Sequence, residues 1–63
     1  MKLNDEKIRM LMHRQRITQS DVSKQCGYSR TTVNAICNGR GCRYEVAEAI
    51  AKVLDVPLEE IKR

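Results

Sequence analysis

Apolar residues recur at spacings of three and four along most of this chain, which is the period of an α-helix. No segment shows the strict alternation of apolar and polar residues that is typical of a half-buried strand. Glycine and proline are rare, and they divide the helical pattern into short pieces with brief connections. The pattern therefore predicts an all-α fold, a small bundle of five helices in which neighbours cross steeply.

Capping residues mark where the first two helices begin. Asn4 is a favourable N-cap for the first helix. Thr18 is a favourable N-cap for the second, and Asp21 lies where the acidic residue of a capping box would lie. The predicted inward residues of these two helices are Ile8, Leu11, Met12, Val22 and Cys26.

A turn and a third helix follow. Gly27 lies where helices commonly end in a left-handed residue, a conformation that glycine adopts without steric cost. Ser29 is a strong N-cap for a helix over about residues 30–37, and an Asn-Gly pair ends it. Two short helices joined by a tight glycine-containing turn form a helix-turn-helix, so the second and third helices are predicted to make this motif. The predicted inward residues of the third helix are Val33 and Ile36.

The last third of the chain contains the longest apolar pattern. A polar loop over residues 39–43 precedes it, and Asp55-Val56-Pro57 interrupts it. A final short helix is predicted over residues 58–61, because proline is tolerated at a helix start. The predicted apolar positions of the fourth helix are Tyr44, Val46, Ala47, Ile50, Ala51, Val53 and Leu54.

Charge is divided unevenly along the chain. Residues 1–43 carry nine basic and three acidic side chains, a balance of +6, whereas residues 44–63 carry three basic and five acidic ones, a balance of −2. A one-sided positive field suits a polyanionic partner such as nucleic acid. With only two tyrosines and no other aromatic residue, the chain lacks the interleaved aromatic side chains that stack on single-stranded RNA.

Length and composition exclude several classes of protein. A chain of 63 residues has room for one small domain, here residues 1–63, with a modest core. It has no apolar run long enough to span a membrane and no block that resembles a signal peptide. The single histidine, His13, has no acidic neighbour in sequence, so we expect no enzyme, no cofactor and no small-molecule substrate.

The three cysteines are expected to be free thiols. An odd number of cysteines without a secretory signal argues against a disulfide framework and favours the reducing cytoplasm. Zinc would need four ligands, usually in closely spaced Cys or His pairs, and no such pair occurs, so we expect no metal. Cys26 and Cys37 are therefore expected to act as small apolar residues.

Two stretches of the chain resemble a known family. Residues 17–39, from Ile17 to Gly39, look like the core of the phage-repressor and Cro-like (lambda-repressor-like) helix-turn-helix domains, and residues 47–61 look like that family's fourth and fifth helices. The resemblance implies binding to double-stranded operator DNA, commonly as a homodimer, and regulation of transcription, with repression as the expected outcome. It also implies a cytoplasmic protein encoded by a bacterial chromosome, a phage or a plasmid.

The third helix would lie in the major groove with its N-terminal residues against base edges. Its predicted base contacts are Arg30, which can donate a fork to guanine, Thr31, which can contact a base or a thymine methyl group, and Asn34, which can pair with adenine. Family members use the matching positions in the same way. The predicted contacts to DNA phosphates are Gln19, Ser29, Thr32, Asn38, Arg40 and Arg43.

The sequence leaves two questions open, the dimer interface and an alternative function. The candidates for a dimer interface are Val56, Leu58 and Ile61, which pack equally well against the protein's own core. The alternative function is a protein-interaction module, or an antitoxin-like subunit, that uses the same fold and ignores DNA.

Overall fold

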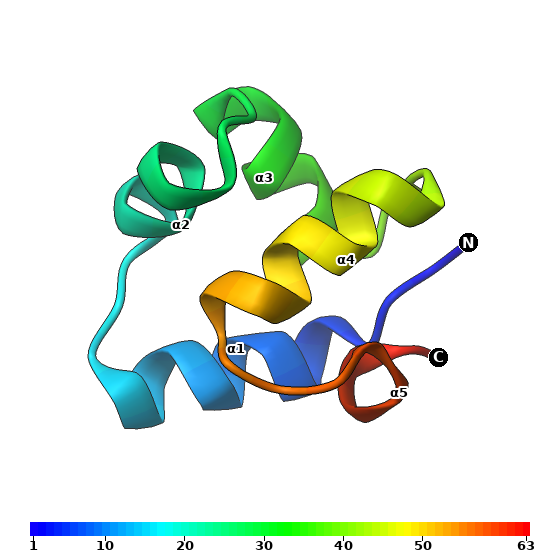
Figure 1. Ribbon diagram of the computed structural model, residues 1–63, viewed down its shortest axis with the longest axis horizontal. Helices are drawn as coiled ribbons and strands as arrows, with labels where there is room; N and C mark the ends of the chain where they lie inside the picture. Colours follow the sequence, from blue (N-terminus) through cyan, green and yellow to red (C-terminus); the bar gives the residue numbers. More distant parts are fainter.

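A computed structural model describes all 63 residues and contains five α-helices and no β-strand (Figure 1). The all-α expectation is therefore confirmed, and the one extended pairing is an antiparallel bridge between Leu3 and Lys62. None of these helices has both the length and the apolar character needed to cross a membrane. The helices are α1 (Asp5–Gln15), α2 (Gln19–Cys26), α3 (Arg30–Cys37), α4 (Tyr44–Val53) and α5 (Leu58–Ile61).

Side-chain caps begin the first three helices where the sequence predicted them. The side-chain Oδ1 of Asn4 accepts a hydrogen bond from the backbone N–H of Lys7 at 3.1 Å. Thr18 and Asp21 form both halves of a capping box at the start of α2. Ser29 accepts a hydrogen bond from the Thr32 N–H at 3.2 Å at the start of α3. These local bonds fix the residue at which each helix begins.

One core of 13 buried apolar residues joins all five helices and the N-terminal segment. No polar or charged residue is buried. The predicted inward residues of α1 and α3 are all in this core, whereas Cys26 of α2 is only partly buried against it. The core consists of Leu3, Ile8, Leu11, Met12, Val22, Val33, Ile36, Cys37, Ala47, Ile50, Ala51, Leu54 and Ile61.

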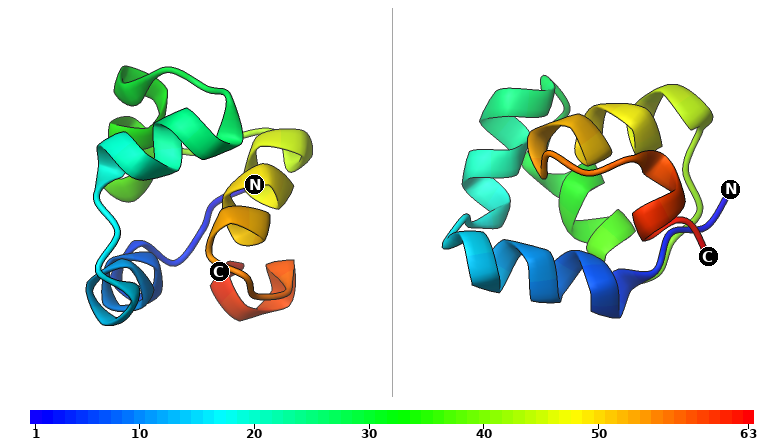
Figure 2. Two further views of the ribbon diagram at one scale, coloured as in Figure 1. Left: turned by 60° about the vertical axis from the view of Figure 1, so that its left-hand side comes forward. Right: turned by 60° about the horizontal axis from the view of Figure 1, so that its bottom comes forward.

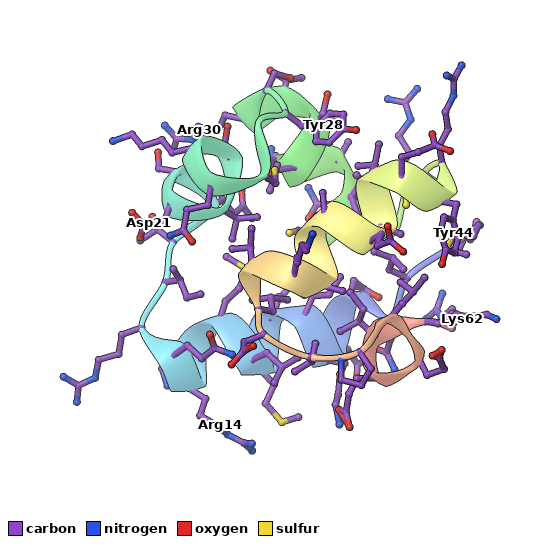
Figure 3. All side chains as sticks on the ribbon, viewed as in Figure 1. Arg14, Asp21, Tyr28, Arg30, Tyr44 and Lys62 are labelled. Atoms are coloured by element: carbon purple, nitrogen blue, oxygen red, sulfur yellow. The ribbon has the colours of Figure 1, made fainter.

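Two apolar residues differ from what the pattern predicted, and the position of a third, which the pattern left open, is decided by the structure. Tyr44 was assigned to the apolar face of α4 but is 55% exposed, because the first residue of that helix projects beyond the core (Figure 3). Leu3 was not assigned to the core but is 1% exposed, because the N-terminal segment pairs with the end of the chain. Ile61, which the sequence left open between a dimer interface and the protein's own core, is 0% exposed and belongs to the core.

The helices α2 and α3 lie together at the top of the molecule in the view of Figure 1 and α1 lies at the bottom, with α4 and α5 along one side (Figures 1 and 2). Helix α4 packs against α2 and α5, and α1 packs against α3 and α5. The N–H of Asn4 donates to the Ile61 carbonyl at 2.7 Å, so the start and the end of the chain are tied together. This packing covers one face of α3 and leaves the opposite face to solvent.

Candidate nucleic-acid interface

The turn between α2 and α3 is held by two hydrogen bonds within the motif. The Gly27 N–H donates to the Ser23 carbonyl at 3.1 Å, and the Ser23 hydroxyl donates to the Tyr28 carbonyl at 2.6 Å. Gly27 has a φ of 81°, a left-handed conformation that strains any residue with a Cβ, although no atom lies close enough to obstruct one. The predicted left-handed turn is therefore confirmed, and Ser23 additionally fixes the direction in which α3 leaves it.

Helix α3 is divided into a buried face and an exposed face. Val33 is 0% exposed and Ile36 3%, as predicted. The three predicted base-contacting residues all lie on the opposite, exposed face, and Arg30 lies at the end of the molecule formed by α2 and α3 (Figure 3). Their order along the helix is Arg30, Thr31, Asn34.

The exposed face of α3 forms a ridge between two surface depressions, and Thr31 borders both. The first depression is lined by Gln19, Arg30, Thr31 and Asn34, so the first residue of α2 lies beside the predicted base-contacting side chains. The second lies between α3, the loop that follows it and the start of α4. It is lined by Tyr28, Thr31, Thr32, Ala35, Ile36, Arg40, Gly41, Cys42, Arg43, Glu45 and Val46.

The predicted phosphate-contacting residues are distributed around this ridge. Gln19 lies on one flank, and Thr32, Arg40 and Arg43 line the other. Ser29 and Asn38 line neither depression but are exposed at the two ends of α3. Asn38 caps the helix through its backbone N–H.

Two hydroxyl groups at the start of α3 lie against each other. The Ser29 Oγ and Thr32 Oγ1 atoms are 2.9 Å apart, and the same Ser29 oxygen caps the helix. Both residues are exposed. Each hydroxyl can accept a second hydrogen bond or rotate to donate one outward, so capping does not prevent contact with an anion.

The loop between α3 and α4 is held by backbone hydrogen bonds. The Arg40 N–H donates to the Ala35 carbonyl at 3.1 Å, and the Cys42 N–H donates to the Met1 carbonyl at 2.8 Å. Both arginine side chains of the loop remain exposed. The N-cap of α4 is Arg43, which makes no side-chain cap, so the first N–H groups of α4 have no side-chain acceptor.

Sequence reasoning missed part of this surface. Tyr28, in the turn before α3, was not among the predicted site residues, yet it lines the second depression. The uncapped start of α4 could have been predicted from the sequence. Arg43 occupies the position where serine, threonine, aspartate or asparagine usually caps a helix.

The basic side chains on this side of the molecule are not neutralised by ion pairs. The ion pairs of the structure join Lys7 to Glu60 and both Arg9 and Arg63 to Asp5, all away from the exposed face of α3. Hydrogen bonds from the Thr18 backbone and hydroxyl hold the pKa of the Asp21 carboxyl below its usual value, so this capping acid is ionised at neutral pH. The basic residues free of ion pairs on α2, α3 and the loop are Lys24, Arg30, Arg40 and Arg43.

The three cysteines are free thiols. Burial raises the pKa of Cys37 and of Cys42, which keeps both thiols protonated and weakly reactive at neutral pH. No three His, Cys, Asp or Glu side chains come close enough together to hold a metal ion.

Comparison with known families gives an independent assignment. A profile of the Cro/C1-type helix-turn-helix DNA-binding domain matches residues 7–62, which covers all of α2, α3, α4 and α5 and most of α1. Comparison with curated proteins and with solved structures found no significant match. The matched range includes both flanks of the ridge formed by α3 as well as the motif itself. The chain therefore belongs to the Cro/C1-type helix-turn-helix DNA-binding domains.

Proposed function

We propose that this protein is a sequence-specific regulator of transcription, acting as a repressor, that inserts α3 into the major groove of double-stranded DNA. The observation that carries the proposal is the exposed ridge of α3, which presents Arg30, Thr31 and Asn34 between two flanks that hold polar and basic side chains. A helix fits the major groove in this orientation when its buried face packs on the rest of the domain. Membership of a DNA-binding family supports the same function.

The three side chains on the ridge have complementary chemistry toward base edges. Arg30 donates a two-pronged fork that matches the O6 and N7 acceptors of guanine. Asn34, one helical turn further along, matches the N6 donor and N7 acceptor of adenine. Thr31 lies between the two depressions and offers a hydroxyl and a methyl group, the latter suited to the thymine methyl.

The flanks of the ridge are assigned to the DNA backbone. Gln19 lies in the first turn of α2, where N–H groups and the helix dipole favour an anion. On the other flank Arg40 and Arg43 lie beside the uncapped first turn of α4. Contacts of this kind position the protein without distinguishing sequences. The remaining phosphate contacts are assigned to Ser29, Thr32 and Asn38.

A homodimer completes the proposal, because one small domain buries too little DNA surface for tight binding. A two-fold symmetric pair would place two copies of α3 about 34 Å apart, one helical turn of DNA. The groove between α4 and α5 contains the two dimer candidates that are not in the core, Val56 and Leu58, together with the exposed Tyr44. This groove is the proposed dimer interface. Repression would follow from occupancy of the operator, in the cytoplasm of a bacterium.

Selection of binding sites from random duplex DNA tests this proposal. The purified protein is incubated with the library at about 50 mM salt, and bound sequences are recovered at rising salt concentrations. We expect a palindromic sequence whose half-sites contain a guanine and an adenine near each other. Enrichment of no sequence, together with capture of a protein partner by the same preparation, would instead favour the protein-interaction module.

A further inference from the structure

Helix α3 is held at both ends by a side-chain hydrogen bond. At its start, the Ser23 hydroxyl donates to the Tyr28 carbonyl at 2.6 Å. At its end, Nη2 of Arg9 donates to the carbonyl of Cys37, the last residue of α3, at 3.0 Å. The first bond comes from within the helix-turn-helix. The second comes from α1, onto which the C-terminal end of α3 descends (Figure 2).

The Cys37 carbonyl has no other partner in the structure. The neighbouring carbonyls of the last turn accept backbone N–H groups from residues 38–40, but none of these bonds goes to Cys37. A positively charged donor at this point satisfies an orphan acceptor and interacts favourably with the negative end of the helix dipole. Arg9 thus adds a side-chain cap to the end of α3, beside the backbone cap formed by Asn38, although it is 28 residues away from Cys37 in sequence.

Asp5 holds the Arg9 guanidinium in place. The same Nη2 atom lies 3.3 Å from Oδ2 of Asp5, one turn earlier on α1. Asp5 is in turn 3.8 Å from Arg63, and only 21% of its side chain is exposed. The Arg9 side chain is itself 56% exposed, but its charge is engaged by Asp5 and the Cys37 carbonyl, whereas Arg14 on the same helix forms no ion pair.

We propose that Arg9 is a positioning residue for DNA recognition: it fixes the end of α3, and through it the orientation of the base-contacting ridge and of the loop carrying Arg40 and Arg43. This inference rests on the proposed function, because it assigns Arg9 a role in discriminating between DNA sequences. Its side chain does not touch DNA. Loss of the bond leaves the end of α3 held by the packing of Ile36 and Cys37 in the core, without the hydrogen bond that fixes its orientation.

The test compares Arg9→Met with the matched control Arg14→Met, which removes the same charge from the same helix. Affinity is measured for the selected site and for random duplex DNA. We expect R9M to lower the ratio of the two affinities about tenfold, the worth of one hydrogen bond from a charged donor, with the domain still folded. R14M should weaken binding to both DNAs equally and keep the ratio. An unchanged ratio in R9M would overturn the inference.

Amide hydrogen exchange of the DNA-free domain separates this inference from the proposed function. R9M should speed exchange in the last turn of α3 while leaving α4 unchanged, and R14M should speed neither. Identical exchange in R9M and wild type would refute the positioning role whether or not the protein binds DNA. If R9M fails to fold, Arg9→Lys and Arg14→Lys keep the charge; only R9K should lower the affinity ratio, because the shorter lysine side chain does not carry its donor to the position of Nη2. Equal ratios in R9K and R14K would refute it.

Discussion

The carboxylate of Asp21 accepts two hydrogen bonds from Thr18, one from its backbone N–H and one from its hydroxyl, each at 2.9 Å. The Thr18 oxygen accepts the Asp21 N–H in return, at 3.2 Å. This reciprocal pair fixes where α2 begins, and therefore where Gln19 stands relative to the ridge of α3. A local capping motif in this way sets the position of a proposed phosphate contact.

The capping box predicts a dependence of stability on pH. Both bonds hold the pKa of Asp21 in the folded state below its ordinary value of 3.8. The stabilisation is therefore complete above that ordinary value and is lost as the pH falls through the lower, folded value. Thermal unfolding of the wild type should show an acid-dependent loss below about pH 4 that Asp21→Asn lacks. Parallel pH profiles for the two proteins would contradict the assignment.

Val33→Asp should unfold the domain. Val33 is 0% exposed, and an unpaired carboxylate at that position costs several kcal/mol, comparable with the whole stability of a domain this small. Thr31→Asp is the matched control, because it introduces the same charge on the exposed face of the same helix. Circular dichroism melts should show a cooperative transition for T31D and none for V33D. A cooperative melt of V33D near the wild-type temperature would refute the packing of α3.

Arg40→Ala should weaken binding to all DNA sequences by the same factor. The side chain is proposed to contact a phosphate, so its removal should also lower the slope of log affinity against log salt by about 1. Gln19→Ala should weaken binding uniformly as well, but with the slope unchanged, because glutamine carries no charge. Titrations at several salt concentrations with the selected and a random duplex measure both effects. A loss confined to the selected duplex would reassign either residue to base contact.

Leu58→Asp should abolish dimer formation on a palindromic site. Leu58 is half-buried in the groove between α4 and α5, and two carboxylates facing each other across a two-fold axis would repel. The control is Met10→Asp, which changes an exposed apolar residue on α1, outside the proposed interface. Sedimentation of protein–DNA complexes should give two copies per palindrome for wild type and M10D. Two copies for a folded L58D would exclude this groove as the interface.

The sequence predicted the elements set by local chemistry. The third helix has the predicted bounds because Ser29 begins it and the Asn-Gly pair follows its last residue. The left-handed conformation of Gly27 was predictable because Gly27 directly follows the last residue of the helical apolar pattern of α2. The helix-turn-helix and the exposed face of α3 were therefore predictable from the sequence.

What the sequence did not predict depends on contacts between distant segments. The burial of Leu3 requires the N-terminal segment to pair with residues near the other end of the chain. The capping of Cys37 by Arg9 requires α1 to cross the end of α3. The exposure of Tyr44 follows from where α4 begins relative to its neighbours. No periodic pattern encodes such relationships, because each depends on the crossing of two elements.

The central claim, that α3 contacts base edges in the major groove, is tested by pairing Arg30→Ala with base analogues. Each guanine of the selected site is replaced in turn by 7-deazaguanine, which lacks the N7 acceptor, and affinities are measured for wild type and R30A. The account predicts that one replacement weakens the wild type, that R30A loses about 1–3 kcal/mol on the natural site, and that the two losses are not additive. Additive losses at every guanine would contradict it.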